Sequence, residues 1–327
     1  MTGPADVRRA TVGVVIPYYQ REPGLLRRAI DSVLGQTGLG EVRVTILVVD
    51  DASPLPPATD LTRLAIPDGM TIEVVARANG GPGAARNTGI EAALAHGFTH
   101  LAFLDSDDWW EPPHLSTALA GLRTAPFFFG NSMHDDVPSF SYFAGMRGRP
   151  VEGVIPPEEA FATILAECVP HTSQVVYSLD AFPDVRFDET MKRTGEDHLF
   201  WLTIASRGAA MAYSTAILGQ RGRGVSVYRE ALAWDSPAFI PRLIDAYHLR
   251  TLIARRFALL PEAARLNARE RRVAAEEIAF ALARRLRSPR ELPSALAAVT
   301  HEGNGLWAAI GAALPRLPAI RRRMLAA

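Results

Sequence analysis

Four short apolar runs in the first third of the chain alternate with segments of helical spacing. The runs cover residues 11–17, 42–51, 71–77 and 99–105, and two of the segments between them read LLRRAIDSVLGQ and GAARNTGIEAALAHG. Strands and helices that alternate in this way build a parallel sheet with helices on both faces. We therefore predict an α/β fold with a mostly parallel sheet flanked by helices, the second of which should end at Gly97.

The polar residues of this region collect just after the strands. Asp50 and Asp51 close the second run, Asn79 follows the third, and Asp105 and Asp107 close the fourth. In open α/β sheets, ligands bind outside the carboxyl ends of the strands. We expect the functional site at this edge.

The fourth run leads directly into the sequence DSDD, which places Asp105, Asp107 and Asp108 within four residues. Burying a carboxylate without a partner is unfavourable. A divalent cation takes carboxylate ligands together with substrate phosphates, so it would neutralise this cluster. The alternative is a solvated acidic turn in which Asp107 or Asp108 caps the next helix.

Five stretches of the chain together resemble a known family. They are VGVVIPYYQREPGLLRRAIDSVLGQT, ILVVDDAS, NGGPGAARNTGI, LAFLDSDDWWEP and TGEDHLFWL, in that order. This set resembles the family 2 glycosyltransferases, which have the GT-A fold, and its opening block looks like bacterial exopolysaccharide glucosyltransferases of the succinoglycan type. The resemblance covers residues 11 to about 229. It implies a GT-A catalytic domain over residues 1–229 and a helical C-terminal extension over residues 230–327.

The resemblance also implies residues that bind a nucleotide-sugar donor. Pro17 and Tyr19 would line the base pocket, Asp51 would hold the base, and Asp105 would contact the ribose. The full set of nucleotide-binding residues that it implies is Pro17, Tyr19, Glu22, Asp51, Arg86, Asp105, Arg221 and Arg223. Asp107 is similar to the metal-binding aspartate of the family, with Asp108 as its close competitor, and the implied cation is Mn²⁺ or Mg²⁺.

The stretch TGEDHLFWL is similar to the element that supplies the catalytic base in inverting members. An inverting transfer needs a carboxylate to take the proton from the acceptor hydroxyl. Asp197 is our candidate and the adjacent Glu196 its competitor, on a helix with Thr194 as expected N-cap and Gly208 after its end. The alternative is that both acids only favour the positive end of the helix dipole.

Three further features leave two interpretations open. Arg221 and Arg223 lie in GQRGRGVSVYR, which either closes over the diphosphate or is a plain surface loop. His171 has no partner at metal-ligand spacing, so a structural or acceptor-side role is favoured over a metal ligand. Trp109 and Trp110 could stack on a sugar, but at least one should belong to the core.

Composition excludes several other classes of protein. The chain has 35 basic and 35 acidic residues, which is unlike the basic footprint of a nucleic-acid binder. Cys168 is the single cysteine, so an internal disulfide framework is excluded. The amino end lacks an apolar signal region, and no apolar run approaches the roughly 20 residues that span a bilayer. We expect a cytoplasmic protein, either soluble or peripheral at the inner face of the membrane.

The helices after residue 230 are amphipathic, as in RRVAAEEIAFALARRLR. They would pack on the catalytic domain, form a homodimer, or lie on a membrane surface near a lipid-linked acceptor. Packing on the catalytic domain is favoured among the three, and the mixed glutamate and arginine face weakens the membrane arrangement.

The resemblance implies an inverting glycosyltransferase that acts in polysaccharide biosynthesis. Its donor would be a nucleoside-diphosphate sugar such as UDP-glucose, and its acceptor a saccharide or a lipid-linked sugar. The alternatives are a nucleotidyltransferase and a non-catalytic scaffold that keeps the fold. IPYYQREPG lacks the glycine-rich loop that usually follows the first strand of a nucleotidyltransferase, whereas every carboxylate of the expected set is present.

Overall fold

The computed structural model describes residues 10–134, 150–166, 170–191, 193–222, 236–286, 292–302 and 305–326. The chain divides into two compact units, the first made of Met1–Glu189 with Phe200–Val225 and the second of Thr190–Leu199 with Ser226–Ala327. The predicted boundary at residues 229 and 230 lies outside the described residues. Residues 190–199, which we expected in the first domain, belong to the second unit.

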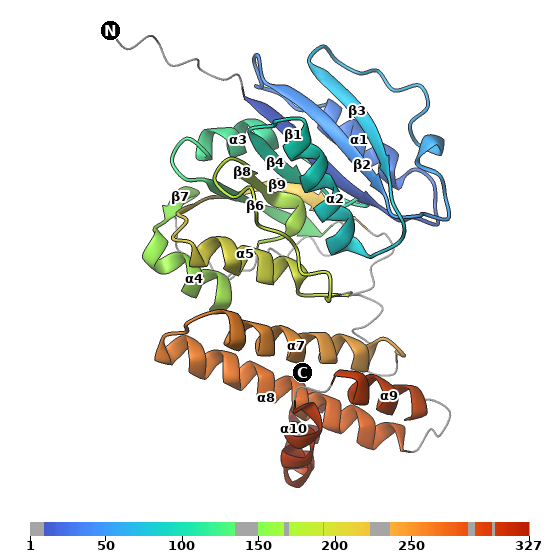
Figure 1. The fold of residues 1–327 in the computed structure, drawn as a ribbon, viewed down its shortest axis with the longest axis vertical. Helices are drawn as coiled ribbons and strands as arrows, with labels where there is room; N and C mark the ends of the chain where they lie inside the picture. The colour runs from blue at the N-terminus through green and yellow to red at the C-terminus, as the bar shows by residue number, and fades with distance from the viewer. Residues whose placement is uncertain are drawn as a thin grey trace. The chain divides into compact units, whose positions relative to one another are not determined.

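Within the described residues, nine strands of unit 1 form one sheet in the order β3-β2-β1-β4-β8-β6-β9-β5, with β7 paired to β9 (Figure 1). The strands β3, β2, β1 and β4 are mutually parallel, and the rest of the sheet is mixed. The strands are β1 (Thr11–Tyr18), β2 (Arg43–Asp50), β3 (Met70–Ala76), β4 (His100–Phe103), β5 (Trp109–Trp110), β6 (Phe127–His134), β7 (Glu152–Ile155), β8 (Val175–Ser178) and β9 (Met211–Arg221).

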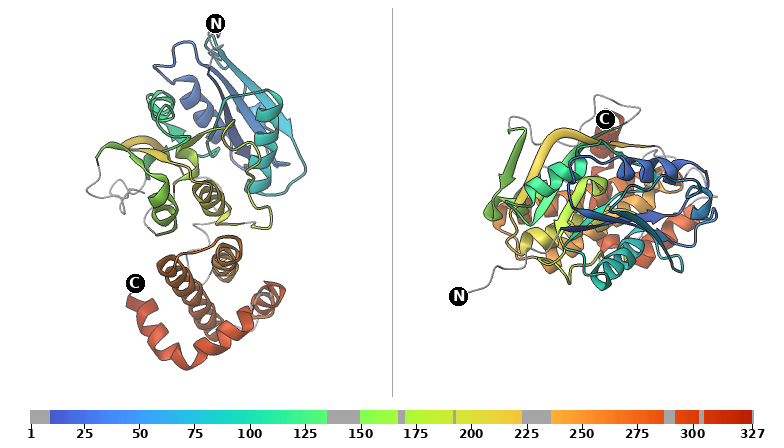
Figure 2. Two further views of the ribbon diagram at one scale, coloured as in Figure 1. Left: turned by 60° about the vertical axis from the view of Figure 1, so that its left-hand side comes forward. Right: turned by 90° about the horizontal axis from the view of Figure 1, so that it is seen from above.

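Helices cover both faces of the parallel part of the sheet, which is why its strands are apolar on both sides. The helices of unit 1 are α1 (Leu25–Leu34), α2 (Pro82–Ala95), α3 (His114–Gly121), α4 (Pro157–Ala166) and most of α5 (Glu196–Ser206). Side chains of α1 and α3 pack in one core cluster with alternate residues of β1 and β2. Helix α2 packs on the opposite face, against Val15 (Figure 2).

The ends of α2 follow the expected local rules. Pro82 occupies the first helical position, where its missing N–H leaves no hydrogen bond unmade. Gly81 precedes it with φ of 88°, and Gly97 follows the last turn with φ of 67°. These are left-handed backbone conformations that favour glycine, so the prediction that Gly97 ends the helix is confirmed.

An aromatic cluster fills the second face beside β4. The ring of Phe103 lies 5.3 Å from that of Phe187, 6.2 Å from that of Phe200 and 6.2 Å from that of Trp201, between ring centroids. All four side chains are buried. Because α5 supplies two of these rings, burial of aromatic surface fixes this part of the helix against the sheet.

The predicted N-cap of α5 is wrong by one residue. Helix α5 begins at Glu196, and the backbone N–H of Leu199 donates to the carbonyl oxygen of Gly195 over 3.1 Å. Gly195 therefore holds the N-cap position that we predicted for Thr194. Its φ of 95° is a conformation that threonine would adopt only with strain, which explains the difference. Gly208 follows the helix as expected, with φ of 77°.

Unit 2 is helical over its described residues, as predicted for the C-terminal extension. Its helices are α7 (Phe239–Arg256), α8 (Pro261–Arg285), α9 (Leu292–Glu302), α10 (Leu306–Ala313) and α11 (Leu317–Ala326). One apolar core joins α7 and α8 to the three shorter helices. None of the helices in the described part of the chain has the length and hydropathy of a membrane span.

Replacing Gly89 of α2 by alanine should lower the free energy of unfolding by about 1–3 kcal/mol, although alanine is the better helix former. A Cβ atom at this position would overlap the side chain of Val15 on β1. Gly311→Ala in α10 is the matched control, because a Cβ there meets no atom within 4 Å. It should raise stability by about 0.5–1 kcal/mol. Urea unfolding followed by circular dichroism measures both, and an unchanged Gly89→Ala midpoint would contradict the close packing of α2.

Candidate active site

The carboxyl ends of the parallel strands bring distant polar residues to one edge of the sheet. The segment after β1 is hydrogen-bonded to the segment after β2: the N–H of Asp51 donates to the carbonyl of Tyr18 over 3.0 Å, and the N–H of Gln20 donates to Ser53 Oγ over 2.9 Å. We predicted from the sequence that the site lies where these strands end. In the structure, the ends of β1 and β2 lie side by side.

Asp51 is held by three donors and is only 3% exposed. Its carboxylate accepts from the guanidinium of Arg77, from the N–H of Gly80 at 3.0 Å and from the N–H of Gly81 at 2.8 Å. The two backbone donors lie at the N-terminus of α2, where a carboxylate is stabilised by the helix dipole. This arrangement fixes the orientation of the Asp51 side chain, and Arg77 is a member of the site that sequence reasoning missed.

Pro17 and Tyr19, which were expected to line the base pocket, and Glu22, which was expected in the nucleotide pocket, lie in or after the last two residues of β1. Pro17 is half-buried within the strand, Tyr19 is 39% exposed and Glu22 is exposed. The hydrogen bonds from this segment to the segment after β2 place it beside Asp51. Tyr19 and Glu22 therefore lie where a ligand from solvent can reach them.

Arg86 of α2 forms a largely buried ion pair with Asp105. Its Nη2 lies 2.7 Å from Asp105 Oδ1, and the Arg86 side chain is 5% exposed. Burial acts to raise the pKa of Asp105, but the charge and hydrogen bond of Arg86, together with the charges of His171 and Arg221, hold that pKa below the usual value. The Asp105 side chain is 30% exposed, so a ligand can reach it from solvent.

Asp108 is the most buried aspartate of the loop after β4, at 2% exposure. It accepts a hydrogen bond from Ser173 Oγ at 2.6 Å and one from the backbone N–H of Gly222 at 2.9 Å. Burial, followed by repulsion from Asp105, raises the Asp108 pKa to about 7. The solvated acidic turn that the sequence left open is therefore wrong for Asp108.

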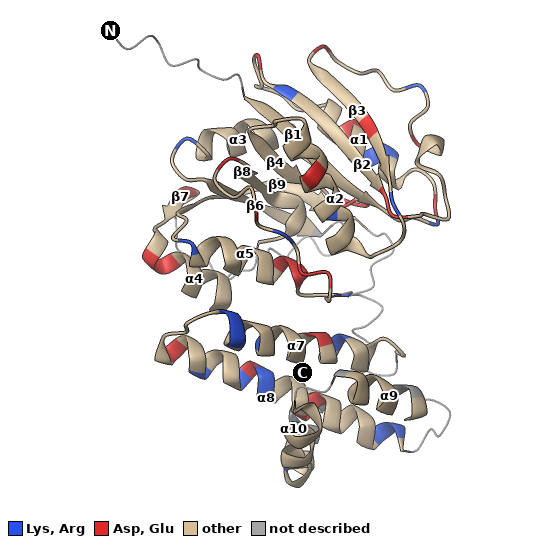
Figure 3. Ribbon diagram, in the orientation of Figure 1, with Lys and Arg blue, Asp and Glu red and all other residues tan. Residues whose placement is uncertain are grey.

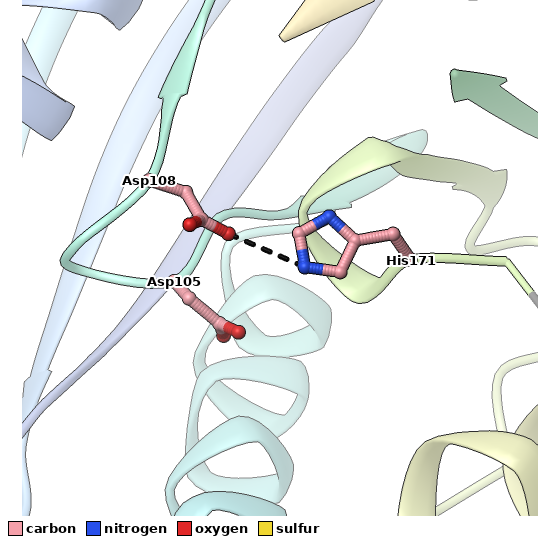
Figure 4. Close-up of side chains that lie close together, drawn as sticks. All are labelled: Asp105, Asp108 and His171. Atoms are coloured by element: carbon pink, nitrogen blue, oxygen red, sulfur yellow. Dashed lines mark ion pairs between the residues drawn. The ribbon is translucent and has the colours of Figure 1, made fainter. Parts of the chain in front are cut away.

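Asp105, Asp108 and His171 form the group that could hold a metal ion among the described residues, with ligand atoms within 4.8 Å of one another (Figure 4). His171 Nε2 lies 3.4 Å from Asp108 Oδ2, and Nδ1 lies 3.3 Å from Ser132 Oγ. Carboxylate oxygens suit Mg²⁺ and Mn²⁺, and an imidazole nitrogen suits Mn²⁺ better than Mg²⁺. The donor set thus fits the expected cation.

Asp107 is not a member of this group. Its carbonyl oxygen accepts a hydrogen bond from Arg28 Nη2 at 2.8 Å, and the same guanidinium lies 3.9 Å from the ring centroid of Trp109. Arg28 on α1 thereby positions the loop that carries Asp107. Trp110 is 3% exposed and belongs to the core, as expected for at least one of the two tryptophans.

The sequence did not assign Ser173 to the site, and it favoured a structural or acceptor-side role for His171 over that of a metal ligand. Ser173 Oγ donates to Asp108 and accepts from the backbone N–H of Asp105 at 3.0 Å, so it joins two aspartates of one loop. His171 has no ligand partner near it in sequence, but the sheet places it beside Asp108. The signal that could have found both is their position just before β8, a strand that pairs with β4.

Strand β9 carries Arg221 to the same region. Gln220 pairs with Trp109 of β5, and Gly222, the next described residue after Arg221, donates to Asp108. The charge of Arg221 lowers the pKa values of both Asp105 and Asp108, against the stronger effect of burial. Arg223 lies outside the described residues.

Glu196 and Asp197 occupy the first turn of α5, in the part of the helix that belongs to unit 2. Glu196 is 6% exposed, whereas Asp197 is half-buried. Asp197 Oδ1 accepts a hydrogen bond from the N–H of His198 at 2.7 Å. Of the two carboxylates, Asp197 is the more accessible.

Comparison with known proteins defines the class to which this fold and site belong. The family described as Glycosyl transferase family 2 matches residues 13–178. The succinoglycan biosynthesis protein ExoW of Rhizobium meliloti (strain 1021) is 32% identical over 297 residues, which are 87% of this chain and 91% of ExoW. The chain belongs to glycosyltransferase family 2. This membership favours a glycosyltransferase over the nucleotidyltransferase alternative.

A second relative has a more specific name. The Escherichia coli protein WfaP, named a UDP-Glc:alpha-D-GlcNAc-diphosphoundecaprenol beta-1,3-glucosyltransferase, is 26% identical over 202 residues. The match covers 60% of this chain and 71% of WfaP.

Two solved structures have the same fold. S. aureus TarS in complex with UDP-GlcNAc has a TM-score of 0.56 at 17% identity, over 92% of this chain and 84% of the TarS chain. The mannosyltransferase PcManGT of Pyrobaculum calidifontis, in complex with GDP-Man and Mn²⁺, has a TM-score of 0.52 at 17% identity, over 97% of this chain and 83% of that chain. These likenesses confirm the predicted GT-A fold.

The raised pKa of Asp108 makes stability depend on pH. Between the ordinary value of 3.8 and about 7, the folded protein keeps a proton on Asp108 that the unfolded chain releases. Asp108 thus stabilises the fold below pH 4, and this contribution is lost as the pH rises toward 7, by up to about 1.4 kcal/mol per pH unit.

Urea unfolding in EDTA buffer from pH 4.5 to 7.5 measures this effect. The variant Asp108→Asn cannot release the proton, so its stability relative to wild type should increase steadily over that range. Two parallel curves would contradict the raised pKa.

Proposed function

We propose that the protein is an inverting glycosyltransferase that takes a sugar from a UDP-sugar, UDP-glucose or a similar donor, in polysaccharide biosynthesis. The acceptor is a saccharide or a lipid-linked sugar. The observation that carries the proposal is the Arg86–Asp105 ion pair together with the acidic loop after β4, at the carboxyl edge of a GT-A sheet. The names of ExoW and WfaP support the process and the donor class.

The nucleotide binds along the strand ends. A carboxylate has about four lone pairs that can accept hydrogen bonds, and three donors contact that of Asp51. Asp51 can therefore accept one more hydrogen bond, from a base N–H. Tyr19, with Pro17 and Glu22 near it, lines the open side of the base pocket. Asp105 accepts from the ribose hydroxyls while Arg86 keeps it ionised.

A divalent cation, Mn²⁺ or Mg²⁺, would be held at the loop after β4 and would neutralise charge on the diphosphate. Asp107 is the donor-facing ligand in this proposal, because it is half-buried whereas Asp108 is buried and accepts two hydrogen bonds. Arg28 keeps the Asp107 backbone in place. Arg221 and Arg223 supply further positive charge for the phosphates.

Asp107→Ala should abolish the metal-dependent part of UDP binding. Calorimetry of UDP with Mn²⁺ and with EDTA measures it, while circular dichroism checks that the fold is kept. The control Asp31→Ala removes a carboxylate of α1 that is 50% exposed and pairs with Arg27, and it should bind UDP as wild type does.

Two results would change the assignment of the metal ligands. If Asp107→Ala keeps its metal dependence and His171→Gln loses it, the cation sits in the deeper group of Asp105, Asp108 and His171. If neither variant loses it, the loop after β4 is not the metal site.

Asp197 is the proposed general base. Its carboxylate takes the proton of the acceptor hydroxyl as that oxygen attacks the anomeric carbon. The bond from this carbon to the diphosphate oxygen breaks at the same time, and UDP leaves with the electron pair. A single displacement of this kind inverts the anomeric configuration. Asp197 is favoured over Glu196 because it is more accessible to an acceptor.

Asp197→Asn should keep near-normal UDP affinity and lose transfer by about 10²–10⁴-fold, since the amide cannot take the proton. Calorimetry gives the affinity, and NMR of the product gives rate and anomeric configuration. The control Asp184→Asn removes a surface carboxylate paired with Arg207, and it should leave the rate within about twofold.

A product that retains the donor configuration would refute the mechanism. If Glu196→Gln loses transfer and Asp197→Asn does not, the base is Glu196. A wild-type protein that binds UDP but neither transfers nor hydrolyses any UDP-sugar would be the non-catalytic scaffold.

A further inference from the structure

Helix α10 in unit 2 is apolar on all sides. Its sequence, LWAAIGAA, contains no charged side chain, and its one polar side-chain group is the indole N–H of Trp307. Leu306, Ile310 and Ala313 are buried in the core of unit 2, which accounts for one side of the helix. A surface helix normally has polar residues on its other side, and a helix that is apolar all round is normally covered.

The outer side of α10 is exposed instead. Trp307 is 44% exposed. Leu314 caps the carboxyl end of α10 seven residues later, so it lies on the same side, and it is 51% exposed. Gly311 lies between them and is also exposed. We call Trp307, Gly311 and Leu314 the α10 face. Large apolar side chains gathered in this way mark an interaction surface.

The segment that contains and follows the α10 face carries only positively charged residues. Residues 303–327 contain four arginines and no acidic residue, in a chain whose total charge is zero. Arg322 is exposed on α11. Arg316 Nη1 lies 3.3 Å from Oε1 of Glu276 on α8. Figure 3 shows arginine and glutamate side by side along α8, whereas α10 is drawn without a charged residue.

We infer that the α10 face, with the arginines that follow it, docks on an anionic lipid surface. Tryptophan and leucine enter the boundary between headgroups and acyl chains, and arginine pairs with anionic headgroups. A second copy of the chain fits less well, because a two-fold contact would present the same segment, in which residues 303–327 hold no acidic residue to pair with the arginines. The inference does not depend on the donor or the acceptor of the enzyme.

Sedimentation of the full-length protein with vesicles tests the inference. Vesicles of phosphatidylglycerol and phosphatidylcholine should bind the protein, and pure phosphatidylcholine vesicles should bind it at least tenfold less. Raising the salt concentration should weaken binding to the anionic vesicles, because it screens the arginines.

Two sets of variants locate the contact. Trp307→Glu with Leu314→Glu should weaken binding to anionic vesicles at least tenfold, and Arg322→Gln should weaken it about fivefold. The matched control is Leu260→Glu before α8, an apolar residue that is 76% exposed and lies outside the α10 face. It should bind vesicles as wild type does.

Circular dichroism and UDP binding should be unchanged in all these variants, which separates loss of docking from loss of the fold or of the donor site. The inference is overturned if wild type does not bind anionic vesicles, or if the double variant binds them as well as wild type. It is also overturned if analytical ultracentrifugation shows a dimer that the double variant dissociates, because the α10 face would then join two copies.

Discussion

The carboxylate of Asp108 ties three distant segments of the chain together. It belongs to the loop after β4, accepts from Ser173 just before β8, and accepts from Gly222 just after β9. Burying a carboxylate without partners is unfavourable, and these two donors offset part of that free-energy cost at 2% exposure. Burial and the charge of Asp105 nevertheless raise its pKa to about 7, and a proton or a cation would offset both effects.

The two faces of the sheet hold this edge in position. On one face α1 packs in the core and also presents Arg28 to the carbonyl of Asp107. On the other face α2 approaches β1 closely at Gly89 and presents Arg86 to Asp105. The aromatic cluster around Phe103 buries the end of β4 just before the aspartates. Apolar packing therefore determines where the charged groups meet.

The two units differ in the kinds of residues that they expose. Unit 1 concentrates paired charges at the strand ends, where Asp51, Asp105 and Asp108 each have a hydrogen-bonding partner. Unit 2 buries one side of α10 and leaves Trp307 exposed on the other, next to a segment whose charged residues are all arginine. An ordinary amphipathic helix has a polar side opposite its buried side, whereas α10 is apolar on both.

Local patterns in the sequence were sufficient for the strands and helices of the parallel sheet, for Gly97 at the end of α2, and for the strand-end aspartates. These features depend on neighbours a few residues apart, so periodicity and backbone preference reveal them. The partners of those aspartates could not be predicted. Ser173 lies 65 residues from Asp108 and Arg77 lies 26 from Asp51, and only the pairing of the strands brings them into contact. The position of Gly195 at the start of α5 and the association of residues 190–199 with unit 2 were likewise decided by tertiary packing, because a left-handed turn and a distant apolar surface leave no periodic signal in the sequence.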